Sequence, residues 1–255
     1  MKLARDMWLV FQRQMTLVVR TPVWIAVGLA QPVVYLLLFA PMLKKALVAT
    51  GGPATYAYAY KVYVPGLLVA IAGFGGLFSG LGILAELRAG IIERVRVTPV
   101  SRTALLLGRA LREVANMVFQ ALIITVLAVP LGLTVPLIDV LLAYLLFSLV
   151  ALMATTLSYG LALQIRNEAA LGPMINALAQ PVMLLGGVLL PLALAPLWIQ
   201  RVADWNPFFW ATSAMRALFA GQASNPAVWK GLIIVLGMAT LAVAWSARLF
   251  ARSLR

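Results

Sequence analysis

The side chains that most often do chemistry in proteins are scarce or missing in this 255-residue chain. It contains no His and no Cys, which removes the commonest general base, the thiol nucleophile and most metal-binding patterns. No Lys follows a Gly, so there is no G-x-x-x-x-G-K-[ST] loop for nucleotide phosphates. The seven carboxylates lie at or beyond the borders of long uncharged segments. We therefore expect no catalytic residue, metal or cofactor in the chain, and a membrane-integral enzyme is a minor alternative.

Uncharged polar side chains inside apolar segments are the next candidates. Asn176 and Gln180 lie four residues apart, so a helix places both on one face, and Gln31 and Tyr35 have the same spacing. Within a membrane such groups face protein or a cavity rather than lipid. They either bond to a neighbouring helix or contact a ligand, and the residues leave both interpretations open. The absence of charge inside these segments argues against a proton or ion relay.

Charge is concentrated in residues 86–113, which hold a third of the charged side chains. Glu86 and Glu93 frame Gly90 on one face of a predicted short helix, and Ser101 is placed to cap a second helix. A small residue between carboxylates lets another surface approach closely. The residues favour a docking helix for a cytoplasmic protein. The alternative is a solvated loop whose arginines follow the positive-inside rule.

Composition indicates what kind of elements hold these residues. Hydrophobic residues make up 64% of the chain and charged residues 11%, and the mean hydropathy is +1.00. Soluble domains are about 45–50% apolar and about 25% charged. The chain is therefore predicted to be an all-α membrane protein. Its net charge of +13 is explained by membrane topology, and we expect no nucleic-acid partner.

Uncharged segments predict six membrane-spanning helices in a single domain, 1–255. Five have the length of one span, about 17–25 residues. The fifth in chain order contains four prolines, so we expect a helix to about Leu190 and then a broken segment. The uncharged segments are 21–43, 62–85, 114–138, 140–165, 169–200 and 231–247.

The flanking segments complete the predicted topology. Residues 1–20 form an amphipathic pattern typical of an interfacial helix, which serves as a simple anchor or as a lever for a cytoplasmic partner. Residues 46–60 are interpreted as an interfacial loop, and 191–221 as an outer segment with an aromatic belt. Most of the 20 cations then lie on one side, which places both termini in the cytoplasm.

The motif AELRAGIIERVRVTPVSR resembles the cytoplasmic coupling region of type 2 ABC exporter permeases, most closely the daunorubicin-resistance group of drug exporters. The segment PGLLVAIAGFGGLFSGLGILAE before it is similar to the same family, as is LPLALAPLWIQRVADWNPFFW near the end, where Pro191 is one of the matching residues. The positions that match the coupling region are Glu86, Gly90, Glu93, Arg94, Thr98, Pro99 and Arg102.

The resemblance implies the six-helix fold of type 2 exporters, with both termini cytoplasmic and 191–221 as an extracellular re-entrant segment. It implies a separate ABC ATPase subunit in two copies, which binds ATP and Mg and docks on 86–113. It also implies a second permease copy, identical or related. The location implied is the plasma membrane of a bacterium or archaeon.

The resemblance also implies site roles and a function. The function is efflux of a lipophilic drug-like or lipid-like molecule, associated with multidrug and antibiotic resistance. Export of a polysaccharide or lipo-oligosaccharide and a non-transporting scaffold are the alternatives. The residues assigned to the substrate path are Gln31, Tyr35, Phe74, Phe78, Asn176, Gln180 and Met183, and those assigned to an extracellular gate are Trp198, Asn206 and Pro207.

Overall fold

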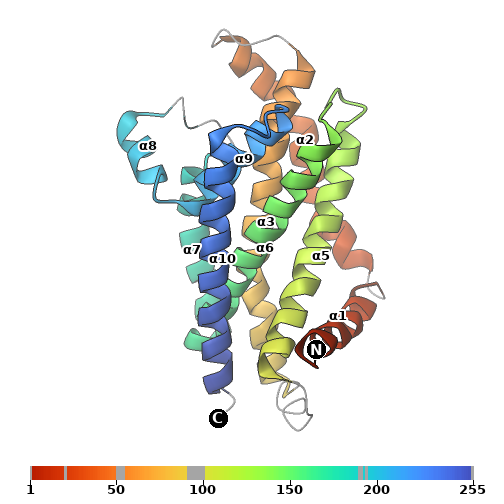
Figure 1. Ribbon diagram of the computed structural model, residues 1–255, viewed down its shortest axis with the longest axis vertical. Coiled ribbons are helices and arrows are strands. Elements are labelled where there is room, and N and C mark those ends of the chain that lie inside the picture. The colour runs from red at the N-terminus through yellow and green to blue at the C-terminus, as the bar shows by residue number, and fades with distance from the viewer. Residues whose placement is uncertain are drawn as a thin grey trace.

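The computed structural model describes residues 2–19, 22–49, 55–90, 101–188, 192 and 195–253. Within these ranges the secondary structure is helical, as predicted. The long helices form an elongated bundle; α1 and the end of α10 lie at its lower end in Figure 1, and α8 and α9 lie at its upper end. The elements are α1 (Lys2–Val19), α2 (Pro22–Ala49), α3 (Tyr56–Arg88), α5 (Arg102–Ala128), α6 (Leu137–Ile165), α7 (Glu168–Leu185), α8 (Leu197–Ala203), α9 (Pro207–Phe219) and α10 (Pro226–Ser253).

Four of the described helices are long and apolar enough to cross a membrane, by length and composition. They are α3, α5, α6 and α10. The other two predicted spans also coincide with helices. In α2 the apolar stretch found among the described residues is Val27–Phe39, and α7 has 18 residues. The chain is thus a helical protein of membrane type.

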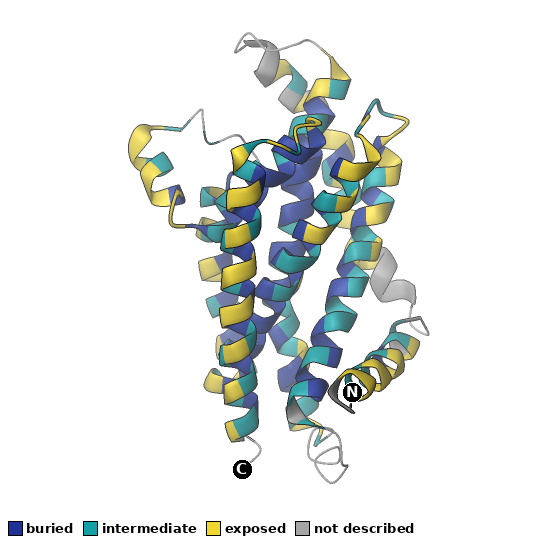
Figure 2. Ribbon diagram, in the orientation of Figure 1, coloured by how far each residue is buried: buried dark blue, intermediate teal, exposed yellow. Residues whose placement is uncertain are grey.

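The core of the bundle lies between α3 and α6, where Figure 2 shows the longest runs of buried residues. A Cβ at Gly76 would lie 2.6 Å from Cβ of Ala154, and one at Gly80 would lie 2.4 Å from Oγ of Ser158. The Ser158 hydroxyl accepts a hydrogen bond from N of Gly80 at 3.0 Å and donates one to the carbonyl of Leu77. The glycines of α3 therefore pack within the chain, where small residues let two helices approach closely.

Helix caps explain several boundaries. The Ser101 side chain accepts a hydrogen bond from N of Ala104 at 3.2 Å, which confirms the predicted cap at the start of α5. Thr55 caps α3 and Asn167 caps α7 in the same way. Asn206 caps α9, with Pro207 in its first turn, where the missing N–H of proline costs nothing.

Two predicted features are wrong, the loop 46–60 and the end of α7. The interfacial loop 46–60 is helical over its described parts: α2 continues to Ala49, and α3 begins at Tyr56 because Thr55 caps it there. Tyr60 is 4% exposed and packs in the core rather than in a loop. Helix α7 ends at Leu185 rather than near Leu190, whereas α5 runs from the cap at Ser101 into the third span, as predicted.

The apolar surface of helix α1 has a packed part and an exposed part. Gly108 of α5 lies against it, since a Cβ there would come within 2.8 Å of Val10 and 2.9 Å of the carbonyl of Met7. Gln14, on the same face, is 8% exposed, whereas Trp8 on the adjoining face is 55% exposed and stacks on Phe11. The predicted single apolar face is therefore two faces, one packed on α5 and one exposed.

Candidate functional site

A cavity of about 530 Å³, here called the main cavity, lies between α2, α3, α5 and α7. All seven residues that the sequence assigned to a substrate path line it, so the structure brings them together around one space. Gln120 of α5 lines it as well. Its full lining is Gly28, Gln31, Pro32, Tyr35, Leu67, Ala70, Ile71, Phe74, Gly75, Phe78, Gln120, Asn176, Gln180, Met183, Leu184 and Val188.

The polar part of the lining consists of amides and one phenol. Nε2 of Gln31 donates a hydrogen bond to the hydroxyl of Tyr35 at 3.1 Å, within α2. Nε2 of Gln120 lies 3.2 Å from where a Cβ of Gly28 would be, so α2 and α5 meet at this amide. Asn176 and Gln180 are exposed, and their amides make no hydrogen bond to any other described residue. The hydrogen bond between helices that was the alternative for this pair is absent from the described part of the chain.

The apolar part of the lining combines aliphatic residues with two phenylalanines and a methionine. Phe74 and Phe78 come from α3 and are half-buried. Met183 of α7 lies against α3, where a Cβ at Gly73 would come within 2.3 Å of its Cε. The ring of Phe208 in α9 lies beside the same glycine, 3.3 Å from that position. Phe208 is a residue that the sequence reasoning missed; its signal is that it follows the capping pair Asn206-Pro207.

No Asp, Glu, Lys or Arg is among the residues lining the main cavity. Amide groups can donate and accept hydrogen bonds, while phenylalanine and methionine adapt to apolar shapes. An ionic ligand would lose its hydration there without gaining a counter-charge. The lining therefore suits an uncharged molecule with an apolar body and hydrogen-bonding groups.

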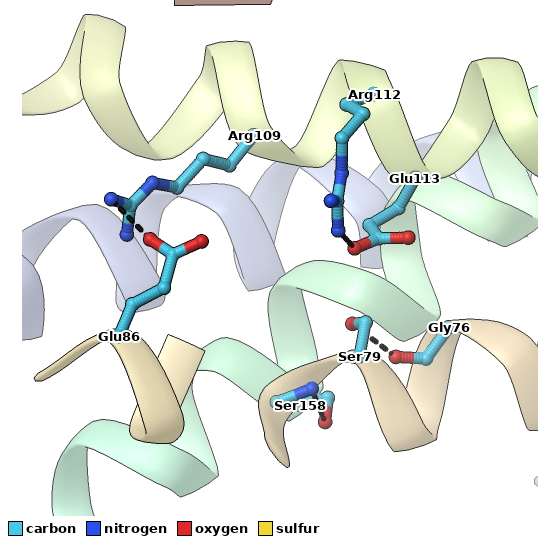
Figure 3. A network of polar contacts seen from close by, with 8 residues as sticks. Gly76, Ser79, Glu86, Arg109, Arg112, Glu113 and Ser158 are labelled. Carbon is cyan, nitrogen blue, oxygen red and sulfur yellow. Dashed lines mark hydrogen bonds and ion pairs between the residues drawn. The ribbon is translucent and has the colours of Figure 1, made fainter. Parts of the chain in front are cut away.

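At the lower end, α3 and α5 are joined by a buried ion pair. Nη2 of Arg109 lies 2.5 Å from Oε2 of Glu86, and the side chains are 7% and 26% exposed (Figure 3). Nε and Nη1 of Arg109 are buried without an acceptor in the described ranges. Arg112 contacts Glu113 beside this pair. The pair thus links α3 and α5 within the predicted coupling region 86–113.

The predicted coupling residues are described only in part. Glu86 is in the ion pair with Arg109, and Arg102 begins α5. Gly90 adopts φ 67°, in the left-handed region that favours glycine, and no atom of the described residues lies within 4 Å of where its Cβ would be. Glu93, Arg94, Thr98 and Pro99 lie outside the described residues.

Of the predicted gate residues, Asn206 and Pro207 lie together at the start of α9, whereas Trp198 lies on α8. Asn206 is 9% exposed and joins α9 to α7, because its Nδ2 donates a hydrogen bond to the carbonyl of Val182 at 2.6 Å. Pro207 follows it in the first turn of α9. Trp198 is on α8 with 68% of its surface exposed, so it does not join the contact between α7 and α9.

Arg216 holds the upper ends of three elements together. From α9 its Nε donates to the carbonyl of Val62 in α3 at 3.2 Å, and its Nη2 donates to the carbonyl of Gly187 after α7 at 2.7 Å. Burial away from water lowers the pKa of Arg216 to about 10, so it remains a cation at neutral pH. Sequence reasoning placed this residue in an aromatic belt and gave it no structural role.

Comparisons with known proteins agree with this architecture. The family model for ABC-2 type transporters matches residues 5–220. The chain is 26% identical over 218 residues to a transport permease named ycf38 in Cyanophora paradoxa, which covers 85% of this chain and 74% of that protein. It is 26% identical over 220 residues to the ycf38 protein of Porphyra purpurea, with 84% and 74% covered. The multidrug ABC transporter permease named YbhR in Escherichia coli (strain K12) is 24% identical over 179 residues, with 68% and 48% covered.

Proposed function

Because the chain belongs to the ABC-2 type transporter family, we propose that it is the membrane-spanning permease subunit of an ATP-driven exporter. The proposed substrate is a lipophilic drug-like or lipid-like molecule, taken from the cytoplasm or the inner leaflet. The observation that carries this proposal is the main cavity, which is uncharged and lies between helices of membrane type. The relatives of the chain are named as transport permeases, which supports a subunit that moves molecules rather than converting them.

The size and lining of the main cavity support a compact substrate. Its volume of about 530 Å³ falls within the range of about 300–1,000 Å³ that is typical of drug-sized ligands. Phe74, Phe78 and Met183 offer apolar contacts, and Asn176 and Gln180 offer free amides. A hydroxyl-rich sugar polymer would need many hydrogen-bonding partners along its route, so the mostly apolar lining favours the compact substrate over a polysaccharide or lipo-oligosaccharide. The name of the Escherichia coli relative, a multidrug permease, supports the same substrate class.

The proposed topology has six spans, α2, α3, α5, α6, α7 and α10, with the lower end in the cytoplasm. At 1.5 Å per residue the 18 residues of α7 extend roughly 27 Å, close to the hydrocarbon thickness of about 30 Å. The excess of basic residues on the segments at the lower end supports this orientation. Helices α8 and α9 then form the re-entrant outer segment.

The proposed partner is an ABC ATPase subunit in two copies, docked on residues 86–113. Support comes from the Glu86–Arg109 pair, which joins α3 to α5 within that region and could carry motion into both helices. ATP and Mg would bind in that subunit. A second permease copy, identical or related, completes the proposed assembly in the plasma membrane of a bacterium or archaeon.

Transport by proteoliposomes that contain the permease and its ATPase tests the role of the main cavity. We expect Asn176→Leu with Gln180→Leu to raise the KM for a neutral lipophilic dye about 30-fold, because two hydrogen bonds of about 1 kcal/mol each are lost. Ala177→Leu, on an exposed position of α7 outside the cavity lining, is the matched control and should leave KM unchanged. An unchanged KM in the double variant would contradict the assignment.

A further inference from the structure

A second hollow of about 430 Å³, here called the upper pocket, lies between α8 and α9. It shares no residue with the main cavity. Its lining combines three apolar side chains with two guanidinium groups, an amide, a hydroxyl and one carboxylate. It is lined by Leu192, Leu197, Gln200, Arg201, Asp204, Phe209, Ser213 and Arg216.

The two arginines have unused hydrogen-bonding capacity. Arg216 is anchored through Nε and Nη2 to two backbone carbonyls, and neither Arg216 nor Arg201 has a carboxylate within 4 Å among the described residues. A guanidinium has five N–H donors, so the two bonds to backbone carbonyls leave three donors of Arg216 without an acceptor among the described residues. A half-buried cation whose acceptors are neutral carbonyls gains free energy from an anion that approaches its remaining donors.

The side chains that line the upper pocket carry a net charge of +1, because there are two arginines and one carboxylate, Asp204. Arg201 and Asp204 lie three residues apart at the end of α8 and do not form an ion pair. Planar guanidinium forks bind phosphate oxygens in pairs, which a single ammonium cannot do. The hydroxyl of Ser213 and the amide of Gln200 add neutral donors of the kind that bind phosphate esters.

We propose that the upper pocket binds a phosphate group, either in the headgroup of an anionic membrane lipid or as free phosphate. Leu197 and Phe209 supply an apolar wall on which an acyl chain or glycerol backbone can lie. The neighbouring side chains Trp198 and Trp205 are 68% and 92% exposed, as is typical of residues at the interface between lipid and water. The site needs no ATPase and no transported substrate, so its test is independent of the proposed export function.

Native mass spectrometry of the detergent-solubilised full chain tests this site. Titration with phosphatidylglycerol and phosphatidylcholine should show tighter binding of phosphatidylglycerol. Arg201→Gln should weaken that binding about fivefold, and Asp204→Asn should tighten it about twofold, because each changes the net charge of the pocket by one unit in opposite directions. Lys45→Gln, an exposed charge on α2 outside the pocket, is the matched control.

A competition experiment identifies whether the bound phosphate belongs to a lipid or is free. Displacement of phosphatidylglycerol by millimolar inorganic phosphate identifies a site for free phosphate, and displacement by lyso-phosphatidylglycerol alone identifies a lipid site; both outcomes support the proposal. Equal binding of the two phospholipids, or equal affinity in Arg201→Gln and Asp204→Asn, would overturn it. The melting temperatures of the variants confirm that each is folded, which is expected because Arg201 and Asp204 are exposed.

Discussion

The Glu86→Gln substitution should destabilise the lower end of the bundle by leaving Arg109 without its counter-charge. Arg109 is 7% exposed and Glu86 is 26% exposed. Removing one partner of a fully buried pair costs about 3–5 kcal/mol, because the other charge stays buried and unpaired. Glu86 is a quarter exposed, so water compensates part of this loss, and we expect a cost of about 2 kcal/mol.

The assay is thermal unfolding of the detergent-solubilised permease. A loss of about 2 kcal/mol corresponds to a decrease of about 4–8 °C in Tm for a chain of this size. Arg88→Gln is the matched control, since Arg88 pairs with Glu168 at 2.7 Å but the two side chains are 55% and 43% exposed. That exposed pair should contribute less than about 1 kcal/mol.

A double-mutant cycle separates the pair from the individual residues. Arg109→Gln alone exposes the carboxylate of Glu86 to an uncharged neighbour, while the double variant Glu86→Gln/Arg109→Gln removes both charges. We expect the double variant to be more stable than the sum of the single effects predicts, with a coupling of about 2 kcal/mol. A coupling below about 0.5 kcal/mol would refute the reasoning that these charges depend on each other.

Three further predictions concern packing. Gly80→Leu should lower Tm, because the larger side chain forces α3 away from Ser158 of α6. Gly82→Leu on the same helix should leave Tm unchanged, because no atom of the described residues lies within 4 Å of its Cβ position. Equal shifts in Tm would argue against the packing of α3 on α6. Gly108→Leu should release α1 from α5, seen as faster tryptic cleavage in α1, and unchanged cleavage would contradict the α1 contact. Arg216→Gln should lower the free energy of unfolding by about 1–3 kcal/mol, because its hydrogen bonds to Val62 and Gly187 are lost, and this should lower Tm. An unaltered Tm would contradict the role of Arg216 in holding these elements together.

Features that depend on local chemistry could be predicted from the sequence. The helical class followed from the long apolar runs, and the cap at Ser101 from a hydroxyl before a helical pattern. The four-residue spacings of Gln31 with Tyr35 and of Asn176 with Gln180 correctly put each pair on one face. That all four line the same cavity could not be derived from spacing, because periodicity orients a residue about its own helix and says nothing about the neighbouring helix.

Features that depend on tertiary contacts were missed for the same reason. The alternating tyrosines at 56–60 suggested an interfacial loop, yet Tyr60 is buried in the core because α3 extends beyond its apolar run. The two apolar faces of α1 are distinguishable only once Gly108 marks where α5 contacts it. Trp198 matched a family pattern beside Asn206 and Pro207, but the helix that carries it leaves it exposed.

The measurement that tests the central claim most directly is ATP-driven uptake of a neutral lipophilic dye into inside-out vesicles containing the permease and its ATPase subunit. We predict uptake that requires both subunits and ATP. Glu93→Ala should reduce co-purification of the ATPase and abolish the link between ATP hydrolysis and uptake. Uptake by the permease without ATP, or full transport and co-purification in Glu93→Ala, would contradict the claim that this chain is the permease of an ATP-driven exporter.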